Sequence, residues 1–145
     1  MGKQTEAAAG TSMREFALDR TSVLLRRLAY QAGRTSKQSE PDAVHDLRVA
    51  IRRLSQCMKL FAEFYPEGEG KKLRRKLKAV LRAASGVRDR DVALSLLNEA
   101  RLPVSAALVR ELTKEREEAD RGLSEALEQW ARRSFYRKCR SRLGL

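Results

Sequence analysis

The chain has 145 residues, with 31 Lys or Arg against 19 Asp or Glu, so its formal net charge is +12 at pH 7. This length fits one domain, and 42% hydrophobic residues can bury a core, which argues against wholesale disorder. No apolar run of about 18 residues occurs, and the first ten residues lack the apolar centre of a signal peptide, so we expect a cytoplasmic protein without membrane partners. Cys57 and Cys139 belong to no paired motif, which favours a reducing compartment over a disulfide framework.

Positive charge is concentrated in two segments of the chain. Residues 44–90 hold 13 basic and 5 acidic side chains, and residues 131–145 hold 6 basic and none acidic. Residues 91–130 hold 5 basic and 9 acidic side chains. A basic field of this kind attracts polyanions without selecting among them. A plainer interpretation is that the Lys and Arg side chains form solvated faces that only keep the protein in solution. A balanced mixture of positive and negative side chains would serve that purpose as well.

Apolar residues at helical spacing, with no alternating strand pattern, predict an all-α fold: a four-helix bundle of long antiparallel helices with short loops. The first helix is expected to begin at a capping box, Ser12 with Glu15, and to run until Gly33. The second should begin at Pro41, which suits a first helical turn, and continue to about Phe64.

The third helix is expected to begin near Gly70 and to continue past Gly86. Pro103 should open the last and longest helix. These boundaries predict a disordered N-terminal segment over residues 1–11 and a single helical domain over residues 12–145.

The second predicted helix carries a basic band beside its apolar face. The apolar face comprises Val44, Leu47, Ile51, Leu54, Met58 and Phe61. The band comprises His45, Arg48, Arg52, Ser55 and Lys59. Because it adjoins the core face, this band can line a groove between helices, where guanidinium groups bind phosphate oxygens bidentately. The residues alone equally allow long Arg stems that lie over the bundle edge and a His45 that packs as a neutral core residue.

A second basic band on the third helix comprises Lys71, Arg74, Arg75, Lys78 and Arg82. It lies nearly opposite the apolar positions, which favours a solvated face, although a groove with another helix or subunit could include it. Farther along, residues 87–92 alternate in charge. Asp89 could orient Arg88 toward a ligand, and a helix cap or a surface chain of ion pairs explains the same residues equally well.

Two segments resemble a known family. Val44-His45-Asp46-Leu47-Arg48-Val49-Ala50-Ile51-Arg52-Arg53-Leu54 and Val87-Arg88-Asp89-Arg90-Asp91-Val92 are similar, in order and spacing, to the two motifs of the CHAD family, the conserved histidine alpha-helical domain. The resemblance implies a helical fold of bacteria and archaea whose basic surface binds inorganic polyphosphate, often at polyphosphate granules. With Lys59 of the basic band, the expected polyphosphate-binding residues are His45, Arg48, Arg52, Arg53, Lys59, Lys71, Arg74, Arg75, Lys78, Arg82 and Arg88.

The sequence also departs from the family pattern. Typical CHAD members contain two related four-helix halves, whereas this sequence corresponds to one half and has a single histidine, His45. A basic pore built by two halves would then need a second copy of the chain, or else this protein is a reduced version with weaker binding. Of these two alternatives we expect a homodimer. Arg90 stands where the family more often has an apolar residue.

Other classes of function are less well supported. An enzyme is not expected, because neither a catalytic triad pattern nor a phosphate loop nor a metal-ligand spacing occurs, and no metal or cofactor is predicted. A histidine phosphotransfer module is a weak alternative, because His45-Asp46-Leu47-Arg48 is like the start of a phosphoacceptor box but no proline follows. Nucleic-acid binding by the same basic surface is the main competitor of polyphosphate binding.

Overall fold

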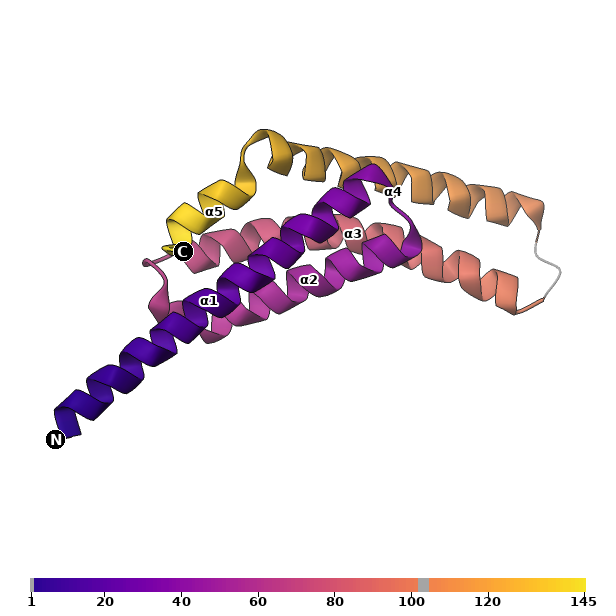
Figure 1. Cartoon of the computed structure of the whole chain (residues 1–145). Coiled ribbons are helices and arrows are strands. Elements are labelled where there is room, and N and C mark those ends of the chain that lie inside the picture. Colours follow the sequence, from indigo (N-terminus) through magenta and orange to yellow (C-terminus); the bar gives the residue numbers. More distant parts are fainter. Residues whose placement is uncertain (1, 102–104) are drawn as a thin grey trace.

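The computed structural model describes residues 2–101 and 105–145, with side chains from Ser12 onward. The helices are α1 (Gly2–Lys37), α2 (Pro41–Leu60), the 3-10 turn η1 (Ala62–Phe64), α3 (Glu69–Glu99), α4 (Ala106–Arg132) and α5 (Phe135–Leu143) (Figure 1). No strand occurs in these ranges, so the all-α prediction is confirmed. The described chain has five α-helices, one more than predicted.

Helix α1 is the longest of the five, with 36 residues, whereas the last helix was expected to be the longest. Ser12 lies inside α1, so the predicted capping box does not mark the helix start. The segment Ala7-Ala8-Ala9 is a strong helix former, and no stop signal separates it from the rest of α1. Gly33 also lies inside α1, since one glycine costs a helix only about 1 kcal/mol. The division into residues 1–11 and 12–145 stays a prediction.

Helix α2 begins at Pro41, as predicted, and ends at Leu60, before the expected Phe64. Helix α3 was expected to meet Gly86 and to resume beyond it, and it passes through Gly86 without a break. A Cβ atom built at Gly86 would lie 3.8 Å from the Cβ of Ala119 on α4, so this position packs closely against the neighbouring helix.

The last predicted helix is divided into α4 and α5. Ser105 caps α4, because its Oγ accepts a hydrogen bond from the backbone N–H of Leu108 at 3.2 Å. Pro103, the expected start, lies outside the described residues. Helix α4 ends at Arg132, and Ser134, with a φ of 51°, turns the chain into α5. The turn contains no proline or glycine, so no stop signal marks the end of α4.

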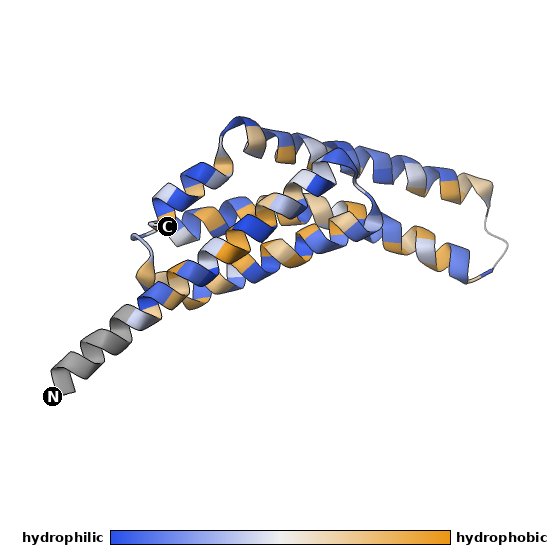
Figure 2. Ribbon diagram, in the orientation of Figure 1, coloured by the Kyte–Doolittle hydropathy of each residue, from blue (hydrophilic) through white to orange (hydrophobic). Residues whose placement is uncertain are grey.

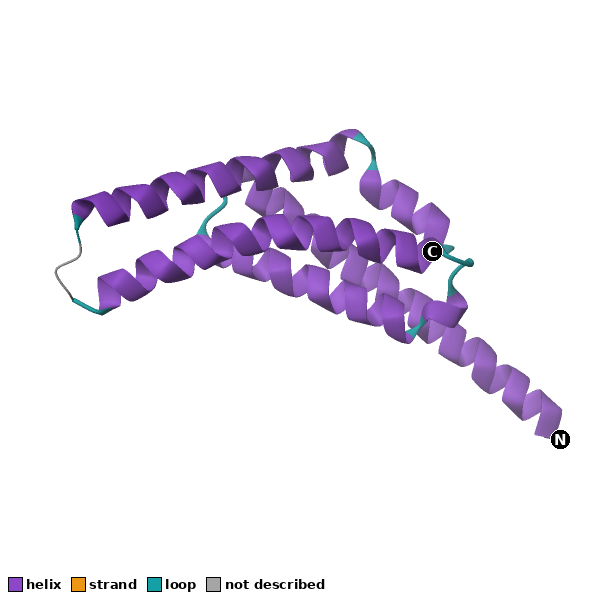
Figure 3. Ribbon diagram, turned by 180° about the vertical axis from the view of Figure 1, so that it is seen from behind, coloured by secondary structure: helices purple, strands orange, loops and turns teal. Residues whose placement is uncertain are grey.

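The helices follow one another as neighbours. Helix α1 packs on α2, α2 on α3 and α3 on α4, and short α5 turns back to contact α1, α3 and α4 (Figures 1 and 3). The N-terminal end of α1 and the hairpin end of α3 and α4 project at opposite ends of the molecule (Figure 1). No helix in the described part is long and apolar enough to cross a membrane.

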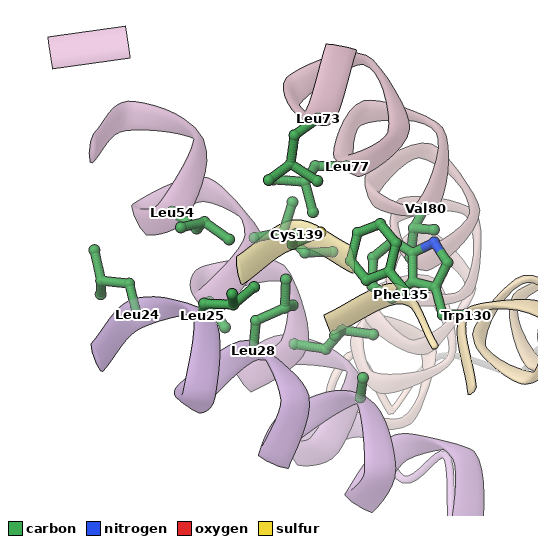
Figure 4. Packing of buried hydrophobic residues seen from close by; sticks show 14 of the residues in the cluster. Leu24, Leu25, Leu28, Leu54, Leu73, Leu77, Val80, Trp130, Phe135 and Cys139 are labelled. Carbon is green, nitrogen blue, oxygen red and sulfur yellow. The ribbon is translucent and has the colours of Figure 1, made fainter. Parts of the chain in front are cut away.

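One hydrophobic core draws on all five helices. Apolar faces turn inward and polar faces outward (Figure 2), and Leu25, Leu54 and Leu77 are among the side chains that meet in the centre (Figure 4). The predicted core face of α2 is confirmed, since its apolar residues from Val44 to Met58 are buried and Phe61 packs partly against the cluster. Burial of this apolar surface, at roughly 25 cal/mol per Å², stabilises the fold and holds α2 and α3 side by side.

A small polar cluster is buried between α1 and the start of α3. The Oγ1 of Thr21 donates a hydrogen bond to the carbonyl of Ala17 at 2.7 Å and lies 2.6 Å from the hydroxyl of Tyr65. Burial raises the pKa of Tyr65 to about 12. The hydrogen bond between Thr21 and Tyr65 holds the segment between α2 and α3 against α1. It also gives each buried hydroxyl a partner.

Candidate functional site

Arg48 marks the junction of the two basic helices. Its Nε donates a hydrogen bond to the Oγ of Ser85 on α3 at 3.2 Å, and its side chain is half-buried. Because α2 and α3 are antiparallel neighbours, this contact sets their register. One turn before Arg48 on α2 and one turn after Ser85 on α3, His45 lies level with Arg88. One turn after Arg48 and one turn before Ser85, Arg52 lies level with Arg82.

Seven of the predicted site residues share the side of α2 and α3 that contains the Arg48–Ser85 contact. At about 100° per residue, Arg74, Lys78 and Arg88 fall on the same side of α3 as Ser85. On α2, the predicted band falls on the matching side. We call this set the basic groove, and it comprises His45, Arg48, Arg52 and Lys59 of α2 with Arg74, Lys78 and Arg88 of α3.

The remaining four predicted residues lie elsewhere. Arg75 and Arg82 are exposed on the outer side of α3, away from its buried face, and Lys71 is exposed beyond the level at which α2 ends. The solvated-face interpretation therefore describes these three better than the groove does. Arg53 lies on the opposite shoulder of α2, where it lines a cavity of about 460 Å³ between α1 and α2 with Arg27 and other residues. Arg52 and Arg53 thus point to different sides of α2, because neighbours on a helix point about 100° apart.

The charge of Arg48 is not neutralised within the described structure. Burial lowers the pKa of Arg48, and the nearby positive charges of Arg52 and Arg88 lower it further, while Asp89 acts in the opposite direction. No carboxylate forms an ion pair with Arg48, Arg52 or Arg88 in the part of the chain with described side chains. A bound anion stabilises a cation that is partly desolvated and lies among like charges.

Two arginines that lie between other pairs of helices are neutralised. Arg34 of α1 binds Asp46 of α2 at 2.7 Å, and Arg90 of α3 faces Glu115 of α4 at 3.4 Å. The Arg90–Glu115 pair explains how a charged residue is accommodated where the CHAD pattern more often has an apolar one. The ion pairs between helices in the described residues thus lie at the α1–α2 and α3–α4 interfaces, and none of them involves a residue of the basic groove.

Arg116 of α4 forms the most connected of these ion pairs. Its Nε binds the Oδ1 of Asp91 at 2.9 Å, a guanidinium N–H donates to the carbonyl of Ser39, and Asp120 lies 4.0 Å away. The Asp91 side chain is only 8% exposed. One arginine thus links the α1–α2 loop, α3 and α4 behind the groove.

His45 is exposed, so its alternative placement as a packed core residue is wrong. The side chain sits at the same level as Arg88 and has no hydrogen bond among the described residues. Arg74 is half-buried, and its Nε has no hydrogen-bond partner there. His45 therefore leaves a donor available to a bound anion, whereas the Nε atom of Arg74 is buried.

Comparison with known protein families identifies the family of this chain. The family model described as CHAD domain matches residues 21–144, most of the chain. The chain belongs to the CHAD family. No curated protein and no solved structure matches it.

The two CHAD motifs divide into structural and surface residues. Asp46 of the first motif holds α1 to α2, and Asp91 of the second holds α3 to α4. Arg48 and Arg88, from the same motifs, meet in the groove. Sequence reasoning missed Ser85, which orients Arg48, because a serine inside a helix carries no signal until its neighbour is known.

Proposed function

We propose that the basic groove binds inorganic polyphosphate without catalysing a reaction. The observation that carries this proposal is the position of Arg48, half-buried, oriented by Ser85 and close to Arg52 and Arg88 without a carboxylate partner. Guanidinium groups bind phosphate oxygens through charge-assisted hydrogen bonds, which are about twice as strong as neutral ones. Membership of the CHAD family supports the same ligand.

The length of the row of cations in the groove suits a linear polyanion. From His45 to Lys59 the groove follows α2 for about 21 Å, at 1.5 Å per residue. Cations recur at nearly every turn on one helix or the other. A flexible chain with one charge at each phosphate unit can place successive oxygens against these cations. A single small anion would neutralise only the cations at one turn of the helices.

Aromatic side chains near the groove are already engaged in packing, which favours polyphosphate over single-stranded nucleic acid. Phe61 packs edge-on against Phe16 at a centroid distance of 6.1 Å and contacts Phe64 at 6.3 Å. Tyr65 is buried. Proteins that bind single strands stack bases on exposed aromatic rings, and no such ring lies among the seven groove residues.

A competition assay tests this proposal. Labelled long-chain polyphosphate is bound at physiological salt and displaced with unlabelled polyphosphate, duplex DNA or single-stranded RNA at equal phosphate concentration. We expect polyphosphate to displace the label at far lower concentrations than either nucleic acid. Equal displacement by DNA or RNA would refute the specific claim and favour a general nucleic-acid-binding surface.

We further propose that two copies of the chain enclose one polyphosphate in the cytoplasm, at polyphosphate granules. A net charge of +12 makes two free copies repel each other, and a polyanion between them relieves that repulsion. Light scattering at micromolar protein should show a dimer that polyphosphate stabilises. A monomer in both conditions would refute the dimer and leave the groove proposal intact.

A further inference from the structure

A second cavity lies between α3, α4 and α5, on the side of α3 that faces away from the basic groove. Its volume is about 370 Å³, near the small end of the range of roughly 300–1,000 Å³ for ligand pockets. None of the seven groove residues lines it. Its walls are apolar and come from three helices, with Leu73 and Val80 on α3, Ala126 and Trp130 on α4, and Phe135 on α5 (Figure 4).

The floor of this cavity is aromatic and rigid. The rings of Trp130 and Phe135 stack with a centroid distance of 4.2 Å and an angle of 3° between their planes. Tyr136 packs edge-on against both rings, at 6.2 and 5.3 Å. Such a cluster is held in place by its own packing, so the cavity is formed before any ligand binds.

The rim of the cavity is strongly basic. Five cations line it, and they are Lys72, Lys76, Arg133, Lys138 and Arg142. The one lining acid, Glu69, lies 3.6 Å from the ammonium of Lys72. The other four cations form no ion pair within the described residues. An apolar floor with unpaired cations at its edge fits a molecule with one apolar and one anionic part.

The thiol in this cavity behaves as part of the apolar wall. Cys139 is 5% exposed, and burial raises its pKa to about 11, although the charges of Lys76 and Arg142 act in the opposite direction. The thiol therefore stays protonated at neutral pH and is a poor nucleophile.

We propose that this cavity binds a single-chain amphipathic anion, a medium-chain fatty carboxylate. The hydrocarbon chain lies on Trp130 and Phe135, and the carboxylate meets the unpaired cations of the rim. Polyphosphate has no apolar part to place on the aromatic floor, and an uncharged amphiphile leaves the rim unpaired. A two-chain lipid is too large for a cavity of about 370 Å³. This site does not depend on the function proposed for the groove.

Intrinsic fluorescence tests the site directly, because Trp130 is the only tryptophan in the chain. The full chain is titrated with dodecanoate below its micelle concentration, and in parallel with dodecyl maltoside and with long-chain polyphosphate. We expect dodecanoate alone to give a saturable shift of the Trp130 emission. An equal shift with dodecyl maltoside, or no saturable shift with dodecanoate, would overturn the proposal.

Two variants locate the binding site within the cavity. Lys138→Glu reverses one rim charge and should weaken dodecanoate binding about tenfold or more, the scale of a charge-assisted contact. Lys114→Glu makes the same charge change at an exposed position of α4 outside the cavity, and it should bind dodecanoate as the parent does. Equal weakening in both variants would show that only net charge matters and would overturn the site.

A third variant fills the cavity. Ala126→Phe places a ring in the cavity and should abolish the dodecanoate response while polyphosphate binding is retained. A circular-dichroism spectrum and a urea-unfolding transition like those of the parent show that the variant is folded. Unchanged dodecanoate affinity in folded Ala126→Phe would refute the site. Because the two ligands are measured on the same variants, failure here is distinguishable from failure of the groove proposal.

Discussion

Arg48→Ala should weaken polyphosphate binding strongly and leave the free protein about as stable as before. A hydrogen bond to a charged group contributes about 1.5–3 kcal/mol. Since each 1.4 kcal/mol is about tenfold in affinity, loss of the Arg48 contact should raise the Kd roughly tenfold to a hundredfold. In the free protein the same charge is disfavoured by burial and by Arg52 and Arg88. Its removal should offset the lost hydrogen bond to Ser85, so the unfolding free energy should change by less than about 1 kcal/mol.

The matched control is Arg53→Ala, which removes the same charge from the adjacent turn of the same helix. Arg53 lies in the α1–α2 cavity, outside the basic groove. Arg52→Ala should therefore behave like Arg48→Ala, and Arg53→Ala should cost far less affinity. Kd values come from fluorescence anisotropy of labelled polyphosphate at two salt concentrations, and stability comes from urea titration. By analogy with nucleic acids, each groove variant should also reduce the slope of log affinity against log salt by about one.

Two results would refute this role of Arg48 in polyphosphate binding. Equal weakening by Arg48→Ala, Arg52→Ala and Arg53→Ala would mean that net charge alone attracts the ligand. A loss of several kcal/mol of stability in Arg48→Ala, with binding by the folded fraction unchanged, would make Arg48 a structural residue.

Three further outcomes are expected, each measured as the unfolding free energy by urea titration. Asp91→Ala should destabilise the protein by about 1–3 kcal/mol, because it leaves Arg116 without its closest carboxylate, and the folded fraction should still bind polyphosphate; an unchanged stability would contradict this ion pair. Thr21→Val should cost about 1–3 kcal/mol because the hydroxyl of Tyr65 loses its partner, whereas Tyr65→Phe should cost less, and the reverse order would be contrary to the proposed hydrogen bond. Stability should fall as pH rises above about 9, because the unfolded chain releases the Cys139 proton near its ordinary pKa of 9.0 while the folded state holds it until about 11. With Cys139→Ala the fall should begin about one pH unit higher, where unfolded Tyr65 loses its proton, and an identical profile would show that Cys139 does not contribute.

The helical fold and the core face of α2 could be predicted from sequence because both depend on periodicity. Val44 and Met58 are separated by four helical turns, and a stripe of that length has one way to be buried. Helix ends were harder to predict. Ser12 has the pattern of an N-cap, yet α1 runs through it, because a local cap competes with the favourable helix propensity of the residues before it.

The site was predicted in part, and the errors have a geometric origin. Arg52 and Arg53 are adjacent in the motif, but only a known neighbour on each side of α2 shows that they face different grooves. The pairing of Arg34 with Asp46 was also outside the reach of the sequence, since no local rule joins a helix end to the next helix. Motif matching finds residues that matter without separating those that hold the fold from those that meet a ligand.

The distribution of acids decides which cations remain for a polyanion. Carboxylates at Glu115 and Asp91 neutralise Arg90 and Arg116 where α3 meets α4, and Asp46 neutralises Arg34 where α1 meets α2. The side of α2 and α3 that contains Arg48 receives no such carboxylate in the described structure, although it carries as dense a set of cations. Had the acids been spread evenly, the same net charge would have given internal ion pairs and no electropositive groove. The arrangement of the charges, rather than the net charge of +12, therefore leaves this face of the molecule electropositive.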